Sequence, residues 1–144
     1  MFTVRQLSVF LENKPGRLCS ATDTLSKEGI NISALTLADT TEFGILRLIV
    51  DDPEKAAEIL RESGVVVRIT DVLAVAMNDA PGGAGDILHT LSGDGLNIEY
   101  MYVCVGRASG KPIMVVRTDD CARAAVILNR AGYGEVDPSD ISPA

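Results

Sequence analysis

One pattern of residues occurs twice along the chain in the same order, and this duplication restricts the possible folds more than any other feature. Matched residues of the two copies are separated by the same number of positions up to a longer turn in the second copy, residues 106–111. After this turn the separation is two residues greater. A repeat of this kind indicates one structural unit used twice. We therefore predict two repeats, residues 1–70 and 71–144. The matched segments are Val9 with Val75, Pro15-Gly16 with Pro81-Gly82, Thr24-Leu25-Ser26 with Thr90-Leu91-Ser92, Gly29 with Gly95, Asn31-Ile32 with Asn97-Ile98, Ala56-Ala57 with Ala124-Ala125, Ile59-Leu60 with Ile127-Leu128, and Gly64 with Gly132.

Each repeat has the periodicity of a strand, a helix, two strands, a helix and a final strand. Leu7, Val9 and Leu11 alternate with other residues, as in a half-buried strand. Apolar residues then recur at helical spacing from Leu18 to Leu25. The rest of the first repeat is predicted as strands at 30–38 and 43–50, a helix at 53–63 and a strand at 65–69.

This order of elements predicts an α+β fold in which each repeat is a ferredoxin-like βαββαβ unit. Two helices then cover one face of a four-stranded antiparallel sheet. No Gly or Pro occurs between Val65 and Met77, so we expect the last strand of the first repeat to run directly into the first strand of the second. The closing strand of the second repeat is weak in the sequence, and we expect the tail from Pro138 to Pro143 to be frayed.

Charge and hydropathy exclude several classes of function. The 144 residues carry 13 Lys and Arg against 20 Asp and Glu, which gives a formal net charge of −7. Nucleic acid and anionic membranes both attract clustered cations, which this balance disfavours. The longest apolar run, Val72–Met77, is far too short to span a bilayer. Arg5 lies inside the apolar N-terminal stretch, unlike the layout of a signal peptide. We therefore expect a cytoplasmic protein that binds neither nucleic acid nor membranes.

Residues that usually carry catalysis are sparse. Cys19, Cys104 and Cys121 include no Cys-x-x-Cys pair, which argues against a zinc site or a disulfide framework. We expect them to be small buried side chains in a reducing cell. The single histidine, His89, falls in a predicted helix with no triad partner, and there is no phosphate-binding loop of the Walker type. The sequence predicts no enzymatic activity, no cofactor and no metal site.

The repeated Pro-Gly turns are the features best suited to bind a small ligand. Each lies between a strand and a helix, where backbone N–H groups carry partial positive charge, and Gly lets a ligand approach the backbone. Such a corner suits a carboxylate or a phosphate, and the pair Gly82-Gly83 predicts a more open second loop. Asn13 and its counterpart Asp79 can accept a hydrogen bond from an ammonium group, while Asn31 and Asn97 follow the first helix of each repeat. Together these groups fit a free amino acid.

Two pairs of segments resemble the ACT domain family, whose members are small regulatory modules that bind amino acids. Glu12–Leu18 followed by Gly29–Ile32 carries the resemblance in the first repeat, and Asn78–Gly83 followed by Gly95–Ile98 carries it less closely in the second. The resemblance covers nearly the whole chain, which is therefore similar to a stand-alone tandem ACT protein. It implies that the two repeats pack side by side into one eight-stranded antiparallel sheet with helices on one face.

The resemblance also implies two ligand sites at the seam between the repeats, each joining the Pro-Gly loop of one repeat to the Asn after the first helix of the other. Asp79 stands where the first repeat has Asn, and its charge would attract an ammonium group but repel a carboxylate. The first site consists of Asn13, Lys14, Pro15, Gly16, Arg17 and Leu18 with Asn97, and the second of Asp79, Ala80, Pro81, Gly82, Gly83 and Ala84 with Asn31.

Taken without the resemblance, the same residues admit other interpretations. Pro-Gly turns begin many helices that bind nothing, Asn31 and Asn97 can cap the preceding helices, and Lys14 and Arg17 can be ordinary solvated charges. A module without a ligand could instead assemble with a partner enzyme and regulate it in trans. Both interpretations remain open at this point.

We expect a regulatory sensor for a free amino acid, with micromolar to millimolar affinity, because two or three charge-assisted hydrogen bonds contribute roughly 1.5–3 kcal/mol each before the association cost. A homodimer is the expected assembly, and closure of the seam is the expected signal. An RNA-binding module needs basic charge and stacked aromatic residues, and Tyr100 with Tyr102 is the only close pair. The sequence identifies neither the amino acid nor any regulated enzyme.

Overall fold

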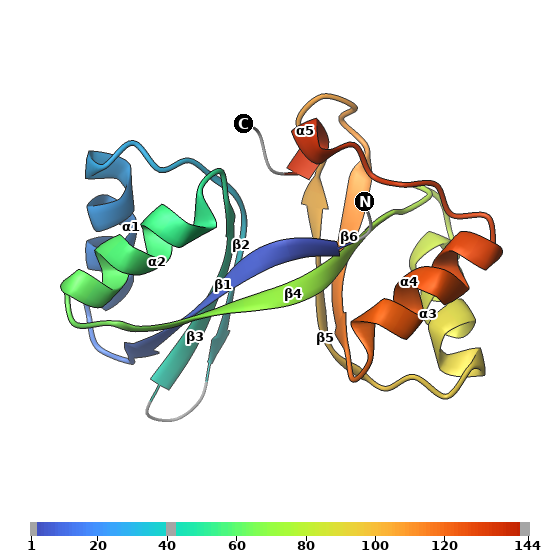
Figure 1. Ribbon diagram of the computed structural model, residues 1–144, viewed down its shortest axis with the longest axis horizontal. Coiled ribbons are helices and arrows are strands. Elements are labelled where there is room, and N and C mark those ends of the chain that lie inside the picture. The colour runs from blue at the N-terminus through green and yellow to red at the C-terminus, as the bar shows by residue number, and fades with distance from the viewer. Residues whose placement is uncertain (1–2, 40–42, 142–144) are drawn as a thin grey trace. The chain divides into compact units, whose positions relative to one another are not determined.

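The computed structural model of the protein describes residues 3–39 and 43–141. Within them it contains six strands and five helices, grouped in two compact units (Figure 1). One unit consists of Arg5–Thr70, and the other of Asp71–Ile141 with Thr3 and Val4. The boundary between the units crosses two strands: it divides β4 (Val66–Ala76) between Thr70 and Asp71, and β1 (Thr3–Glu12) between Val4 and Arg5. The predicted α+β class is confirmed.

The first unit follows the predicted order of elements. It contains β1 (Thr3–Glu12), α1 (Arg17–Lys27), β2 (Ile32–Asp39), β3 (Phe43–Val50) and α2 (Pro53–Glu62), followed by the start of β4. β1 and β2 both pair antiparallel with β3, which therefore lies between them. β3 has the predicted bounds, and the other elements agree with the prediction to within a few residues.

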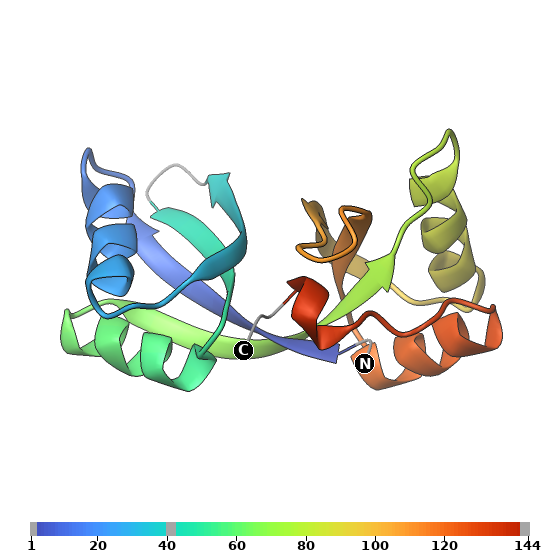
Figure 2. The ribbon, with the colours of Figure 1, turned by 90° about the horizontal axis from the view of Figure 1, so that it is seen from above.

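Both helices of the first unit pack on the same face of its strands (Figure 2). Val9 of β1, Leu48 of β3 and Val67 of β4 belong to one buried cluster with Leu25 of α1 and Leu60 of α2. Successive side chains of a strand point to opposite faces, so these strand residues define the face that the helices cover. Burial of such aliphatic side chains is the main force that holds the helices against the sheet.

The second unit repeats this construction. α3 (Gly83–Gly93), β5 (Ile98–Val105), β6 (Pro112–Thr118) and α4 (Cys121–Arg130) follow β4. β6 pairs antiparallel with both β4 and β5. Its two longer helices share one buried cluster with the strands, formed by Leu73, Val75, Ile87, Leu91, Leu96, Met114, Val116, Ala124 and Leu128.

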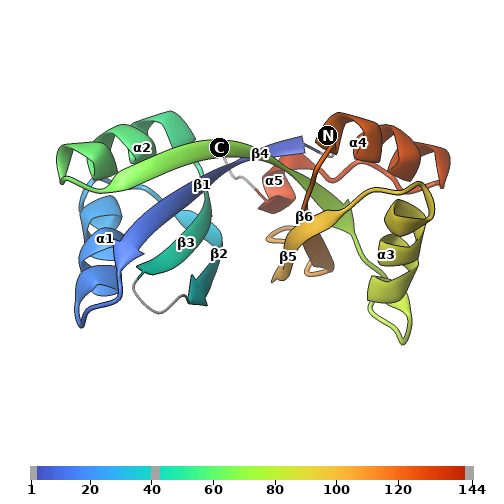
Figure 3. The ribbon, with the colours of Figure 1, turned by 90° about the horizontal axis from the view of Figure 1, so that it is seen from below.

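The expectation of eight strands is wrong for the described residues, which contain six, hydrogen-bonded in the order β2-β3-β1-β4-β6-β5. The last strand of the first repeat and the first strand of the second are one continuous strand, β4 (Figure 3), as the lack of Gly and Pro predicted. Residues 133–137, after α4, form no strand. That segment contains Gly134, Glu135 and Asp137, and all three residue types are depleted in strands.

The expectation of a frayed tail is also wrong as far as Ile141. α5 (Pro138–Ile141) lies beside the turn between β5 and β6 (Figures 1 and 3). The backbone carbonyl of Asp140 accepts a hydrogen bond from the N–H of Arg107 at 3.0 Å. Its carboxylate accepts from the N–H groups of Ala108 and Ser109 at 2.7 and 2.8 Å. The longer turn of the second repeat therefore holds the tail, while residues 142 and 143 lie outside the described residues.

The cysteines are less buried than expected. Cys19 is exposed on α1, Cys104 and Cys121 are partly exposed, and all three are free thiols. Partial burial raises the pKa of the Cys104 thiol. Cys121 is the first residue of α4, and its Sγ lies 3.6 Å from Nη1 of Arg117. The expectation of three buried cysteine side chains is wrong, because Cys19 is exposed and Cys104 and Cys121 are only partly buried.

Candidate functional site

The first Pro-Gly corner is a tight turn that joins β1 to α1. The N–H of Lys14 donates to the carbonyl of Glu12 at 2.8 Å, and the N–H of Arg17 donates to the carbonyl of Lys14 at 3.3 Å. Gly16, the residue before α1, has a φ of +84°, which a residue with a Cβ adopts only under strain. The turn therefore depends on glycine, and it places the start of α1 directly after the end of β1.

The helices that follow the two Pro-Gly corners lack the side-chain cap that the other long helices have. Asp52 caps α2 by accepting from the N–H of Lys55 at 3.1 Å. Asp120 caps α4 by accepting from the N–H of Arg123 at 3.0 Å. In the described part of the chain, no side chain makes such a bond at the start of α1 or α3. The first N–H of each helix, that of Arg17 in α1 and that of Gly83 in α3, donates within the turn to the carbonyls of Lys14 and Ala80 at 3.3 and 3.0 Å. At neither helix start does a described side chain cap the N–H groups that follow in the first turn.

Three charged side chains surround the first corner. The carboxylate of Glu12 lies 2.9 Å from Nζ of Lys14 and 3.9 Å from Nη2 of Arg17. The hydrogen bond from Lys14, its charge and the charge of Arg17 hold the pKa of Glu12 below its ordinary value. The corner thus carries two cations against one anion, in addition to the positive end of the α1 dipole. This electrostatic environment favours a carboxylate.

A cavity of about 170 Å³ opens at this corner, between the turn, α1 and the β2–β3 hairpin. Four of the predicted site residues line it, namely Asn13, Lys14, Arg17 and Leu18. Pro15 and Gly16 shape the turn beside it. The sequence prediction missed four further lining residues. Leu11 and Glu12 end β1 directly before the turn, and Leu37 and Gly44 come from the β2–β3 hairpin.

The second corner has the same turn but less room. Gly82 has a φ of +89°, while Asp79, Ala80 and Pro81 are exposed in the turn. A Cβ at Gly83 would lie 2.0 Å from the carbonyl oxygen of Asn78, and Gly83 is buried. The expectation of a more open second loop is therefore wrong at Gly83, where the missing side chain makes room for the backbone. Ala84 packs against the hydrophobic core.

The two Asn residues after the first helices occupy equivalent positions. The N–H of Asn31 donates to the carboxylate of Asp51 at 3.1 Å, and that of Asn97 donates to Asp119 at 3.1 Å. Both Asn residues are exposed at the junction between helix and strand. The same anchoring in both repeats supports the duplication. That Asn97 and Asn31 complete the two ligand sites stays a prediction.

The family is decided by the sequence as a whole. Residues 2–140 match the family described as ACT domain pair. The chain belongs to this family. The resemblance to the ACT family that the sequence indicated is thus confirmed.

Several solved structures are similar to this ACT pair. A protein from Bacteroides thetaiotaomicron is 39% identical, with 96% of this chain and 95% of that chain covered and a TM-score of 0.87. Regulatory subunits of aspartate kinase from Thermus thermophilus, in a ligand-free form, and Thermus flavus are 15% and 14% identical, with TM-scores of 0.63 and 0.61. They cover 92% and 91% of this chain and 98% and 97% of their own. At these identities the kinase subunits show the fold alone. No curated protein matches the chain.

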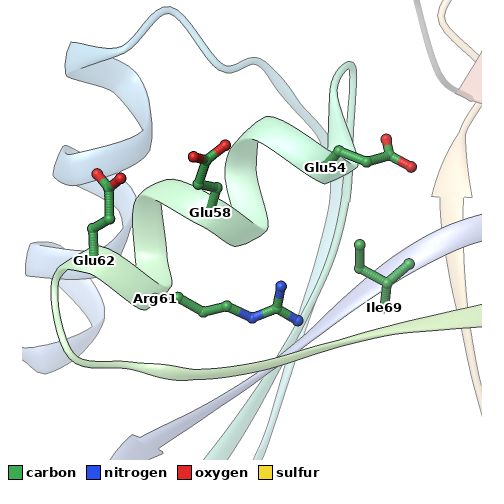
Figure 4. A pocket seen from close by; sticks show the side chains of 5 residues that line it. All are labelled: Glu54, Glu58, Arg61, Glu62 and Ile69. Carbon is green, nitrogen blue, oxygen red and sulfur yellow. The ribbon is translucent and has the colours of Figure 1, made fainter.

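Two other cavities of the ACT pair are more exposed and less specific. One, of about 570 Å³, lies along α2 and β4 and is lined by three Glu residues with Arg61 and Ile69 (Figure 4). There Nη2 of Arg61 donates to the carbonyl of Val67 at 2.9 Å. The side chains of Glu58 and Glu62 point away from the side chain of Arg61. The other, of about 670 Å³, lies between α3 and residues 131–134 and includes His89.

The described residues of the ACT pair also bear on metal binding, on the single histidine and on membrane insertion. Among them, no three His, Cys, Asp or Glu side chains are grouped so as to hold a metal ion. His89 is exposed on α3. No described helix combines the length and the apolar character that crossing a membrane requires. The Pro-Gly corners therefore remain the strongest candidate sites.

Proposed function

We propose that this ACT pair is a regulatory sensor that binds a free amino acid at its Pro-Gly corners and has no catalytic activity of its own. The observation that carries the proposal is the uncapped start of α1, which opens beside a cavity lined by Asn13, Lys14 and Arg17. The first-turn N–H groups that follow Arg17 have no cap from a described side chain, and N–H groups at a helix start favour a carboxylate. The matching uncapped start of α3 supports a second site of the same kind.

Each part of a zwitterion has a complementary group at the first corner. The ligand carboxylate accepts hydrogen bonds from first-turn N–H groups of α1, next to the charges of Lys14 and Arg17. The ligand ammonium group donates to the side-chain oxygen of Asn13. We further propose that Asn97 completes this site and that Asn31 completes the site at Asp79. Charge-assisted hydrogen bonds contribute roughly 1.5–3 kcal/mol each, which supports micromolar to millimolar affinity after the association cost.

The regulatory role is supported by membership of the ACT pair family and by a fold shared with regulatory subunits of aspartate kinase. We propose that bound amino acid shifts the association of this chain with itself, as a homodimer, or with a partner enzyme that it regulates in trans. A ligand produces such a shift only through a difference in its affinity for the two states.

A second candidate function is assembly without a ligand. β2 and β5 lie at the two ends of the strand order. Leu35 and Leu37 of β2 are 54% and 50% exposed, and Val103 and Val105 of β5 are 48% and 66% exposed. Edge strands with exposed apolar side chains are templates for pairing with another chain. A ligand-free module that holds a partner through these edges would use the same fold.

A thermal-shift panel of the twenty amino acids separates the two functions. An amino acid at about 100 times its Kd adds about 2.7 kcal/mol to the free energy of unfolding, which raises the Tm of a chain this size by several degrees. We expect a shift with one amino acid or one group of similar amino acids. Stable self-association with no shift for any amino acid would favour assembly instead.

Variants then locate the site. We expect the double substitution Asn13→Ala, Asn97→Ala to reduce the shift to the part that the second corner contributes, because it removes both side-chain amides that we assign to the first site. Lys27→Ala is the matched control, since Lys27 is exposed at the far end of α1. An unchanged shift in the double variant would contradict the assignment of the first corner.

A further inference from the structure

We propose that the first Pro-Gly corner selects an amino acid with a branched aliphatic side chain, the class of valine, leucine and isoleucine. This inference rests on the proposed function, since it names the class of ligand that the same corner binds. It follows from the leucines that line the cavity, of which the sequence predicted Leu18 but not Leu11 or Leu37.

The wall is built by three leucines from three different elements. Leu11 ends the apolar part of β1, Leu18 lies in the first turn of α1 and Leu37 lies near the end of β2. Leu11 is 7% exposed, but Leu18 and Leu37 are 36% and 50% exposed. Their apolar surfaces therefore converge on the cavity and remain accessible to water. A ligand side chain that covers them removes apolar surface from water on both partners.

The cavity has the size of a small aliphatic molecule. Its volume is about 170 Å³, and an apolar cavity of about 150 Å³ accommodates a molecule as large as benzene. Gly44 of β3 also lines the cavity, next to Leu37, and a Cβ there would lie 3.1 Å from Cδ1 of Leu37. A side chain at Gly44 would therefore displace Leu37 or reduce the volume of the cavity.

The charges at the rim act against the other classes of side chain. A cationic side chain would approach Lys14 and Arg17, which repel it. A second carboxylate would have to compete with Glu12, which lies 2.9 Å from Nζ of Lys14. A hydroxyl group that entered among the leucines would lose its hydrogen bonds to water, and that loss is unfavourable unless a new partner replaces them. An alkyl side chain meets none of these penalties.

The second corner does not share this wall. Gly83 occupies the place of Arg17, and Ala84 the place of Leu18, in the repeat alignment. Gly83 is closed off by the carbonyl of Asn78. The aliphatic preference is therefore assigned to the first corner only.

Titration calorimetry of the full chain with individual amino acids tests this class. We expect leucine, isoleucine and valine to bind, and alanine to bind at least about tenfold more weakly than leucine, because each methylene moved out of water contributes about fourfold in affinity. Threonine, which has nearly the shape of valine, is the sharpest comparison, and we expect it to bind at least about tenfold more weakly than valine. Aspartate and lysine should bind more weakly still.

Two variants and a matched control test the wall itself. Gly44→Ala displaces Leu37 or reduces the volume of the cavity, so leucine should lose more affinity than alanine does. Leu37→Ala removes part of the wall, so leucine should lose roughly tenfold while alanine changes little. Leu35→Ala is the control, because Leu35 lies on the same strand, is 54% exposed and does not line the cavity. Leucine affinity should be unchanged in this control.

The possible results separate this proposal from the function on which it rests. If lysine, aspartate or threonine binds best, and Asn13→Ala abolishes that binding, the amino-acid site stands and the aliphatic class is wrong. An equal loss of leucine affinity in Leu35→Ala and Leu37→Ala would also overturn the assigned wall. If no amino acid binds to the full chain at millimolar concentration, the sensor function and the aliphatic class both fail.

Discussion

Arg17 and Gly83 occupy equivalent positions just after the left-handed glycine of each Pro-Gly corner. Arg17 has a long side chain beside a cavity, whereas Gly83 has no room for a side chain. Arg17 places a cation at the rim of a cavity. At Gly83 the hydrogen atom is all that fits, because the carbonyl oxygen of Asn78 occupies the space in which a Cβ would lie. Two corners with the same turn thus differ in how much of the helix start a ligand can reach.

A small substitution at Gly83 should have a large effect on stability. Gly83→Ala places a Cβ 2.0 Å from the carbonyl oxygen of Asn78, so the turn must shift, and overpacking of this kind costs about 1–3 kcal/mol. Gly85→Ala is the control, because a Cβ there meets nothing within 4 Å and Ala stabilises a helix by roughly 0.5–1 kcal/mol relative to Gly. Urea denaturation of both variants measures the difference. Equal stability of the two variants would contradict the close approach at Gly83.

The sequence predicts individual site residues only where they belong to a local motif. Asn13, Lys14 and Arg17 are adjacent to the Pro-Gly turn, so the motif alone predicts them. Leu37 and Gly44 come to the same cavity from the β2–β3 hairpin, and finding them requires the register in which Leu37 pairs with Leu46. Alternation along β2 predicts a strand but does not specify which neighbour it faces. The cavity residues that come from the hairpin could therefore not be predicted without the strand pairing of the fold.

At the scale of elements, the caps distinguish two kinds of helix. Asp52 caps α2 and Asp120 caps α4 in the same way in both repeats, and the sequence Asp51-Asp52-Pro53 already predicts the first of these starts. α1 and α3 begin after a left-handed glycine with no such cap. α2 and α4 thus begin at a capping side chain, whereas α1 and α3 begin at the Pro-Gly corners, where we propose that a ligand binds.

The cap of α4 can be tested directly. Asp120→Ala removes the acceptor for the N–H of Arg123, and loss of such a cap costs about 1 kcal/mol. Asp120→Asn is the control, because its side-chain oxygen can still accept this bond, so most of the stability should remain. The free energy of unfolding from chemical denaturation gives both values. If the two variants lose the same stability, the negative charge at the helix start matters more than the hydrogen bond.

Strand prediction succeeded where β-branched and aliphatic residues dominate, as in Phe43–Val50, and failed at 133–137. In the first repeat the segment after α2 is Val65-Val66-Val67, whereas the equivalent place in the second repeat contains Tyr133 and Gly134. The repeat alignment therefore suggested a strand that the local composition does not support. The chain turns away there and forms α5 instead.

For the whole molecule, the tail was the feature furthest from prediction. Asp140 contacts the turn Arg107–Ser109, which lies more than thirty residues earlier in the chain. A pattern of neighbouring residues in the sequence does not predict a contact between segments so far apart. The N–H and side chain of Ser109, the N–H of Ala108 and the charge of Lys111 hold the pKa of Asp140 below its ordinary value. The tail contact is therefore strongest when this carboxyl group is ionised.

The lowered pKa of Asp140 determines how the contribution of the tail contact to the free energy of unfolding depends on pH. Because the pKa of Asp140 is lower in the folded chain than in the unfolded chain, its stabilisation is fully present above the ordinary Asp pKa of about 3.9 and is lost as pH falls through the lowered value. We expect Asp140→Ala to reduce the free energy of unfolding equally from pH 5 to 8. The difference from the unsubstituted chain should shrink below about pH 4. Urea denaturation across this pH range measures it, and a difference that grows in acid would contradict the assignment.

One strand, β4, closes the sheet of the first unit and opens that of the second. Severing the chain between Thr70 and Asp71 would divide this strand and leave a shortened piece of it at the end of each fragment. The two fragments produced separately are therefore expected to be less stable than the same sequences joined in one chain.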